Sequence, residues 1–314
     1  MAQPANSFSQ YDAVGNREDL ANAIYNISPT QTPFMSGIKK GKSSSTKHEW
    51  QIDSLAAADE SNFVIEGDDA TTDASSPTTR VYNYTAISDK VARVTGTQEA
   101  VDKAGKKSEM AYQLMKKSKE LKTDIEKILL RNGAYNAGDD TTARQCAGVE
   151  SWIATNTSRG VGGADPTGDG SDTATDGTQR AFTEDLLKET IRSCWDAGGE
   201  PDTLMVGAFN KQAVSGFDGN ADRNINANDK KLVTDIRVYV SDFGDLVVIP
   251  NRFQRARTAL VLDMDMWSFD TLRDFKTNDL AKTGDTERKQ ILVEYTLKCN
   301  NEAANGLVAD LTTS

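Results

Sequence analysis

The sequence predicts an α+β protein with long polar excursions around a modest core, and three observations carry this prediction. Hydrophobic residues make up 37% of the 314 residues, which is below the roughly 45–50% usual in globular domains. One pattern with helical periodicity stands out at 108–132, and alternating apolar patterns typical of strands precede and follow it. The length suffices for one large domain or two smaller ones.

Residues 1–45 are expected to form an N-terminal arm with one short helix. Asn16 stands where a helix N-cap would, and acidic residues follow in the first turn. Three apolar residues then recur at helical spacing, namely Leu20, Ile24 and Ile27. Pro29 and Pro33 would end this helix, so 28–38 is predicted to be extended with a few apolar anchors.

Residues 46–97 are predicted to form an extended loop, two strands joined by a long polar excursion. The first strand, 47–53, alternates between two faces, and 81–87 and 91–94 are rich in strand-forming residues. The stretch 66–77 between them contains almost nothing to bury. A hairpin without a core of its own is marginal in water. We therefore expect it to lie against another molecule.

The region 98–180 contains the clearest helix of the sequence, at 108–132, with Gly133 as its stop. Lys and Glu occupy one side, and an apolar stripe occupies the other. The stripe consists of Met110, Leu114, Leu121, Ile125 and Ile128, flanked by Met115 and Leu129. A Gly- and Asp-rich segment follows at 159–177, and we expect it to be a surface excursion.

The rest of the chain is predicted to comprise an α/β region, 181–255, and a strand-rich end, 256–314. Thr183 is placed to cap a helix that Gly198 and Gly199 break. Further helix and strand patterns follow in both regions. A helix is predicted at 209–216, and strands at 203–206, 233–240, 245–250, 259–262 and 289–299.

Bulk properties narrow the class of protein. No apolar run approaches the roughly 20 residues that cross a bilayer, and the N-terminus has no basic or hydrophobic signal region. We expect a protein made and kept in the cytoplasm. The three cysteines, Cys146, Cys194 and Cys299, lack metal spacing, so they are predicted to be reduced, buried thiols.

The formal net charge of −11 argues against a dedicated nucleic-acid binder, because phosphate contacts need clustered Lys and Arg. It does not argue against a protein that encloses nucleic acid. An acidic wall would hold packed DNA loosely by like-charge repulsion, although an acidic balance is also ordinary for a soluble protein.

No constellation of residues predicts catalysis or a cofactor. The single histidine, His48, lies in a polar and aromatic strand, where a structural or exposed role is favoured. Asp263 and Asp265 could share one face of a strand as an acid–base or metal pair, but a turn or strand end explains them equally well. The sequence contains no phosphate-binding glycine loop.

Two acidic runs are weak candidates for a metal, and calcium is the metal to consider. Arg223 replaces the glycine that a calcium loop requires, and the closing glutamate is absent. Solvated loops explain both runs. The first run consists of Asp218, Asn220, Asp222 and Asn224 with Asp229 at the twelfth position, and the second of Asp165, Asp169, Asp172 and Asp176.

A family resemblance rests on several short segments in a fixed order. They are Asp19-Leu20 with Ile24 and Ile27, the stretch from Ser28 to Phe34, His48 to Asp53, Glu66-Gly67, and the helix from Gln113 to Asn132 with Glu120, Asp124 and Glu126. Together they cover nearly the whole chain. In this order the sequence resembles the major head proteins of tailed phages and prophages, which are capsid proteins of the Hong Kong 97 type.

The resemblance implies a Hong Kong 97-like capsid fold with an N-arm, extended loop, spine helix, peripheral domain and axial domain. Region 98–180 would be peripheral and 181–255 axial, and 256–314 would end the axial domain and return to the peripheral one. The arm and the extended loop would lie across neighbouring subunits. The residues expected at these contacts are Phe34, Trp50, Phe63, Glu66 and Tyr82.

The implied function is a major capsid protein that self-assembles into pentamers and hexamers, in an icosahedral head shell around double-stranded DNA. No sequence-specific DNA binding, membrane, metal or cofactor is expected. The implied partners are portal and scaffolding proteins, with a decoration protein as a further candidate. The start at Met1 gives no hint of a cleaved scaffolding segment, so we expect a separate scaffolding protein. The chain would be assembled in the host cytoplasm and end in the virion.

Three rival interpretations stay open at this point. An encapsulin-like compartment would share the fold but hold an enzyme cargo. A soluble hydrolase would use acidic pairs such as Asp263 and Asp265. A tail or decoration protein would form rings, tubes or trimers.

Overall fold

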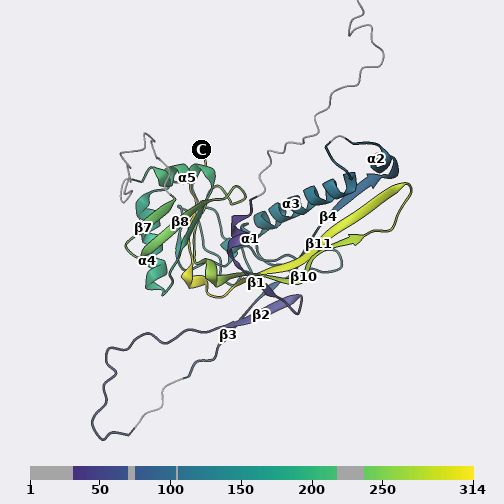
Figure 1. Ribbon diagram of the computed structural model, residues 1–314. Coiled ribbons are helices and arrows are strands. Elements are labelled where there is room, and N and C mark those ends of the chain that lie inside the picture. Colours follow the sequence, from purple (N-terminus) through teal and green to yellow (C-terminus); the bar gives the residue numbers. More distant parts are fainter. Residues whose placement is uncertain (1–30, 70–74, 104, 218–236) are drawn as a thin grey trace, which may run out of the picture.

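Two sheets and a projecting hairpin organise the chain (Figure 1). The computed structural model describes residues 31–69, 75–103, 105–217 and 237–314, so the helix predicted after Asn16 lies outside the described residues. The helices are α1 (Pro33–Gly37), α2 (Gly96–Ala100), α3 (Glu109–Leu129), α4 (Glu184–Asp196) and α5 (Ala208–Ser215). The strands are β1 (Lys39–Lys42), β2 (Lys47–Ile52), β3 (Thr79–Tyr84), β4 (Ala86–Thr95), β5 (Thr157–Ser158), β6 (Thr203–Val206), β7 (Val238–Ser241), β8 (Gly244–Pro250), β9 (Ala259–Leu262), β10 (Trp267–Asp279), β11 (Thr286–Cys299) and β12 (Gly306–Val308).

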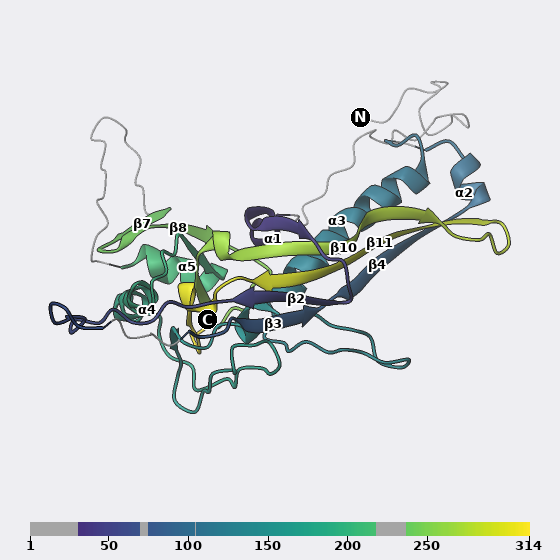
Figure 2. The ribbon, with the colours of Figure 1, turned by 90° about the horizontal axis from the view of Figure 1, so that it is seen from below.

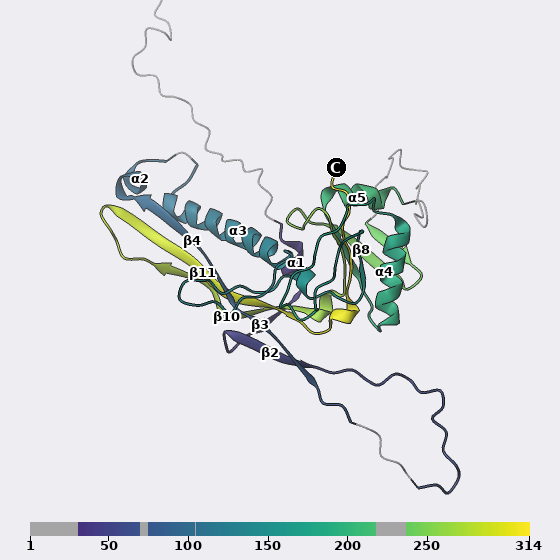
Figure 3. The same cartoon turned by 180° about the vertical axis from the view of Figure 1, so that it is seen from behind.

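The first sheet has four strands in the order β1-β10-β11-β4, and α3 lies along one of its faces (Figures 1 and 3). The helix begins at its predicted cap, where the Ser108 hydroxyl accepts a hydrogen bond from the Ala111 N–H at 3.2 Å. It ends at Leu129, before Gly133. The predicted stripe and the predicted inward face of β11 meet in one core. Its members here include Leu121, Ile125, Leu129, Val293, Tyr295 and Leu297.

The second sheet has six strands in the order β5-β12-β9-β6-β8-β7, with β7 at one edge. The short strand β6 is buried along its whole length, because helices cover one face and the main core covers the other. Leu204 and Val206 pack with residues of α4 and α5, whereas Met205 faces the core shared with α3. The sequence predicted 203–206 and 259–262 with these bounds.

The second side of the predicted extended loop is two strands, of which β3 pairs with β2 as expected, whereas β4 belongs to the four-stranded sheet. Strands β2 and β3 form an antiparallel hairpin whose register runs from Lys47 opposite Tyr84 to Ile52 opposite Thr79. The described residues between them, 53–69 and 75–78, project away from the body (Figures 1 and 2). Beyond β3 the chain enters β4, which pairs with β11 in the four-stranded sheet. One end of the extended loop is thus continuous with the sheet under α3.

One local prediction is wrong, and one strand was missed. The stretch 28–38 is not extended throughout, since Pro33–Gly37 forms α1 with proline in its first turn, a position that proline favours. Strand β10, which has 13 residues, was not among the predicted strands. Its pairing with β11 contains register shifts between Thr271 and Lys276, and bulges of this kind destroy the alternation by which strands are recognised.

Candidate assembly surfaces

The loop between β2 and β3 exposes large apolar side chains to solvent. We call residues 53–69 the tip segment, and all of them are exposed. The exposed fractions are 98% for Leu55, 87% for Phe63, 86% for Val64 and 78% for Ile65. The same segment carries Asp53, Asp59, Glu60, Glu66, Asp68 and Asp69 and no Lys or Arg. A projecting loop that is both apolar and acidic has the composition of a contact surface.

The base of the hairpin is fixed to the body by aromatic contacts. The rings of Trp50 and Trp152 lie 5.5 Å apart between their centroids. The Tyr135 hydroxyl donates to the Tyr82 hydroxyl at 2.8 Å, and burial together with this hydrogen bond raises the pKa of Tyr135. On the same strand as Trp50, His48 Nε2 lies 2.8 Å from Asp270 Oδ2. The hairpin therefore leaves the body from a rigid root.

A buried amide holds the root of the hairpin to β11. Asn83 is inaccessible to solvent. Its side chain donates to the Leu297 carbonyl at 2.7 Å and accepts from the Ala147 N–H at 3.0 Å. Next to it, Thr85 donates to Glu294 at 3.0 Å. Because these groups are buried, each hydrogen bond is costly to lose.

The carboxylate of Glu126 joins three parts of the chain. It is fully buried on α3, and it accepts hydrogen bonds from the N–H groups of Phe34 and Met35, both at 2.8 Å. These two N–H groups stand in the first turn of α1, where they have no acceptor within the helix. A third bond comes from Asn251 Nδ2, after β8, at 2.7 Å. Burial raises the pKa of Glu126, and the three hydrogen bonds oppose this shift.

The Gly- and Asp-rich segment lies largely on the surface, as predicted, but buried groups hold it in place. Asp310, which has a φ of +60° and is inaccessible to solvent, accepts from the N–H groups of Gly160 at 3.0 Å and Gly177 at 2.8 Å. Arg257 Nη2 donates to the same carboxylate at 2.6 Å. A Cβ on Gly160 would lie 2.1 Å from the Thr178 carbonyl oxygen, so glycine is required there.

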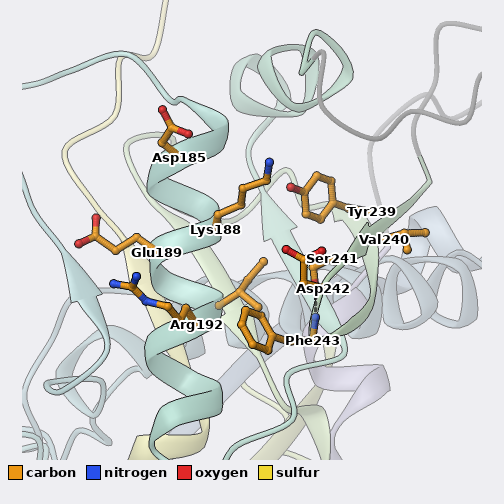
Figure 4. A pocket seen from close by; sticks show the side chains of 10 residues that line it. Asp185, Lys188, Glu189, Arg192, Tyr239, Val240, Ser241, Asp242 and Phe243 are labelled. Atoms are coloured by element: carbon orange, nitrogen blue, oxygen red, sulfur yellow. Dashed lines mark hydrogen bonds between the residues drawn. The ribbon is translucent and has the colours of Figure 1, made fainter.

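A hollow of about 540 Å³ lies between α4 and the end of β7 (Figure 4). Side chains of α4 form one wall, and residues 239–243 form the other. Charges of both signs line it, and Lys188 is paired with Glu184 at 2.9 Å. Phe243, one of the lining residues, has its ring 5.2 Å from that of Trp195, and both rings are partly exposed. The side chains that line the hollow are mixed in charge and polarity, so they do not indicate a particular cofactor.

Comparison with known proteins decides the family. The model of the SU10 major capsid protein family matches residues 5–312. The chain belongs to this family. It is therefore a phage major capsid protein, a subunit of an icosahedral head shell. The major capsid protein of Escherichia phage Phieco32 is 28% identical over 344 residues, which cover 98% of this chain and 97% of that relative.

Solved capsid structures share the fold of this capsid protein at low sequence identity. The capsid of a native GTA particle superposes with a TM-score of 0.65 at 10% identity, covering 96% of this chain and 98% of that one. The capsid of cyanophage A-1(L) gives a TM-score of 0.64 at 11% identity, covering 97% of this chain and 98% of that one. The fold is thus the expected Hong Kong 97-like capsid fold. None of the rival interpretations finds support in these relatives.

The five residues expected at subunit contacts fall into three groups in the capsid subunit. Phe63 and Glu66 are exposed in the tip segment, and Tyr82 is half-buried against Tyr135. Phe34 and Trp50 are instead buried within the chain itself. These two side chains are covered within the subunit, because Phe34 packs edge-on against Trp267 and Trp50 packs on Trp152, so they do not form the exposed contact surface that the sequence predicted for them.

The acidic candidates have local structural roles where the structure describes them. Asp263 follows β9 and accepts from the Asp265 N–H at 3.0 Å, so it caps a 3₁₀ turn, as the alternative interpretation held. Burial raises the pKa of Asp263. In the second run, Asp165 pairs with Arg159 at 2.5 Å and Asp176 with Arg255 at 2.6 Å.

The calcium candidates of the first run, Asp218, Asn220, Asp222 and Asp229, lie outside the described residues. Among the residues that the structure does describe, no cluster of His, Cys, Asp and Glu could hold a metal ion, and no helix is long and apolar enough to cross a membrane. The three cysteines are free and buried, as predicted. Burial raises the pKa of Cys146 to about 11.

The sequence interpretation missed Glu126 and Asp310 as structural residues. Glu126 stands three positions before Leu129 of the apolar stripe, so a charged side chain at the margin of that stripe was the available signal. For Asp310 no local signal exists, because its partners lie 133 and 150 positions away in the sequence.

Proposed function

We propose that copies of this capsid protein form pentamers and hexamers, and that the extended loop of each copy lies across a neighbour. The observation that carries this proposal is the tip segment, whose four large apolar side chains are all at least 78% exposed. Burying such side chains contributes about 1.5–3 kcal/mol each. A neighbour that covered all four would gain on the order of 6–12 kcal/mol before the costs of association are subtracted.

One face of the four-stranded sheet has the properties of a receiving surface. Alternate residues of β4 point away from α3, and on this side Ile87 and Val91 are nearly half exposed. Asp89 lies between them on the same face, where its carboxylate accepts a hydrogen bond from Gln290 Nε2 at 2.6 Å, and the exposed Arg93 follows. The two apolar side chains and Arg93 are complementary to the acidic and apolar tip segment. We assign this face as the docking surface for the loop of a neighbouring copy.

Further parts of the proposal concern the whole head. The shell encloses double-stranded DNA without reading its sequence, and the chain performs no reaction. Its partners are a portal protein and a scaffolding protein, with a decoration protein on the outside, and assembly takes place in the host cytoplasm. Within the subunit, 98–180 acts as the peripheral domain and 181–255 as the axial domain. Membership of the capsid family supports these assignments.

A matched pair of valines tests the role of the loop. Val64 in the tip segment and Val161 in the Gly- and Asp-rich segment are both 86% exposed. We expect Val64→Ser to abolish or strongly reduce closed shells in electron micrographs while the thermal unfolding of unassembled subunits stays unchanged. Val161→Ser should leave both properties unchanged. Normal shells from Val64→Ser combined with Phe63→Ser would contradict the proposal.

Charge reversal tests the receiving surface. Arg93→Glu should reduce the yield of shells, because it places a like charge opposite the acidic tip segment. The second change Asp68→Arg in the same chain should restore part of that yield. Full assembly of the Arg93→Glu variant would refute the assigned surface without refuting the role of the loop.

A further inference from the structure

The solvent side of α3 carries a row of lysines, in a chain whose net charge is −11. We call this row the lysine stripe, and it consists of Lys116, Lys119, Lys122 and Lys127, all exposed. Two acidic residues on the same helix are already neutralised: Glu120 pairs with Lys117 at 2.7 Å, and Asp124 pairs with Lys90 at 2.6 Å.

The stripe itself has no carboxylate partner among the described residues. For three of its members the structure shows no ion pair with a described residue, and Lys122 has only the ring of Phe275, 6.0 Å from its Nζ. The helix therefore presents uncompensated positive charge, whereas the tip segment concentrates negative charge. Such separation of charge within one acidic chain indicates a polyanionic partner for this side of α3.

The dimensions of the stripe suit the backbone of a duplex. With a rise of 1.5 Å per residue, the distance along the axis from Lys116 to Lys127 is about 16 Å. This length corresponds to roughly five base pairs of DNA at about 3.4 Å each. At 3.6 residues per turn, the four side chains occupy an arc of about 140°, so they can approach one groove edge together.

We propose that the lysine stripe contacts the phosphates of the enclosed DNA, so that the α3 side of each subunit faces the genome. This inference rests on the proposed function, in which the shell encloses duplex DNA. The acidic tip segment of a second copy is the competing partner. Its four exposed apolar side chains need an apolar surface, however, and among the described residues the lysine stripe has beside it Met115, which is 52% exposed, and Phe275, which is 37% exposed. Phosphates need positive charge alone.

The first test measures the binding of a fluorescein-labelled 20-base-pair duplex to unassembled full-length subunits as a function of salt. The stripe variant replaces all four lysines by glutamine. A matched control makes the same charge change at four exposed lysines elsewhere, none of which has an ion pair with a described residue. These are Lys40, Lys42, Lys276 and Lys282.

Each phosphate contact contributes about 0.9 to the slope of log K against log salt. Four contacts therefore change the affinity on the order of 100-fold between 50 and 200 mM salt. We expect the stripe variant to lose most of this slope and the control variant to keep it. Equal slopes for wild type and stripe variant, or equal losses in both variants, would overturn the inference.

A second test uses assembled heads. Lysine acylation followed by mass spectrometry should show the stripe protected in DNA-filled heads and reactive in emptied ones, while the control lysines react equally in both. Equal reactivity of the stripe in filled and emptied heads would overturn the inference.

The inference would also be overturned by a stripe variant that fails to form shells but binds DNA like wild type. Such a result would show that this side of α3 contacts a neighbouring subunit and not DNA. If wild-type chains form no shells, the proposed function fails, and the DNA-binding slope still reports separately on the stripe.

Discussion

Replacing Glu126 by glutamine removes one hydrogen-bond acceptor from a site that has three donors. One carboxylate oxygen accepts from Phe34 N–H and Asn251 Nδ2, and the other accepts from Met35 N–H. The single oxygen of glutamine can replace only one of the two carboxylate oxygens. The amide NH₂ group replaces the other oxygen, and because it donates and does not accept, it leaves a buried donor without a partner. An unsatisfied buried donor costs about 1–3 kcal/mol, so Glu126→Gln should reduce the free energy of unfolding by roughly this amount.

The loss of unfolding free energy in Glu126→Gln should depend on pH, and the raised pKa of Glu126 determines the direction. Burial raises the folded-state pKa of Glu126 above its ordinary value of 4.5, so the folded subunit binds this proton more tightly than the unfolded chain. The stabilisation linked to this proton is fully present below the unfolded pKa and is lost as the pH rises through the folded pKa. Glutamine does not titrate. The difference between wild type and Glu126→Gln should therefore be largest near pH 4 and smaller at pH 7.

Urea unfolding of unassembled subunits, followed by tryptophan fluorescence between pH 4 and 7, measures both effects. Glu120→Gln is the matched control on the same helix, because Glu120 is partly exposed and pairs with Lys117. Such a surface pair contributes at most about 1 kcal/mol. A cost for Glu126→Gln that equals the control, or one that grows from pH 4 to pH 7, would refute the reasoning.

Three further predictions concern buried groups. Asn83→Ala should reduce the free energy of unfolding by about 2–3 kcal/mol in urea titrations, because it leaves buried backbone groups at Ala147 and Leu297 unpaired; an unchanged midpoint would contradict this role. Asp310→Ala should make the segment 159–177 the first site of limited proteolysis, since its glycine N–H groups lose their acceptor; a cleavage pattern like that of wild type would contradict it. The three buried cysteines should not react with a thiol reagent at pH 8 until the chain unfolds, because burial raises the pKa of each, to about 11 for Cys146 and about 12 for Cys194; rapid labelling of the native subunit would show that they are accessible.

Local patterns were sufficient to predict those elements whose burial repeats regularly. The apolar stripe of α3 and the short apolar strands β6 and β9 are recognisable because each is buried on a periodic or continuous set of positions. Strand β10 was missed because register shifts interrupt its alternation. Helix α1 was missed because its free N–H groups are satisfied by Glu126, more than 90 positions away.

Contacts between distant segments also explain the mixed result for the candidate site. Phe34 and Trp50 stand in largely polar stretches, and the local sequence does not show which rings pack against them. Trp267 and Trp152 supply these rings through the fold. Phe63 has no such partner and stays exposed at the tip of the loop. A single sequence shows which aromatic residues lie in polar surroundings, but only the packing of the chain shows which of them are left for a neighbour.

The most direct test of the central claim is electron microscopy of the purified full-length protein, alone and together with its scaffolding protein. We expect closed icosahedral shells built from pentamers and hexamers, with density for the tip segment of each copy lying on β4 of a neighbour. Particles in which the tip segment projects into solvent, or a monodisperse monomer under every assembly condition, would contradict it.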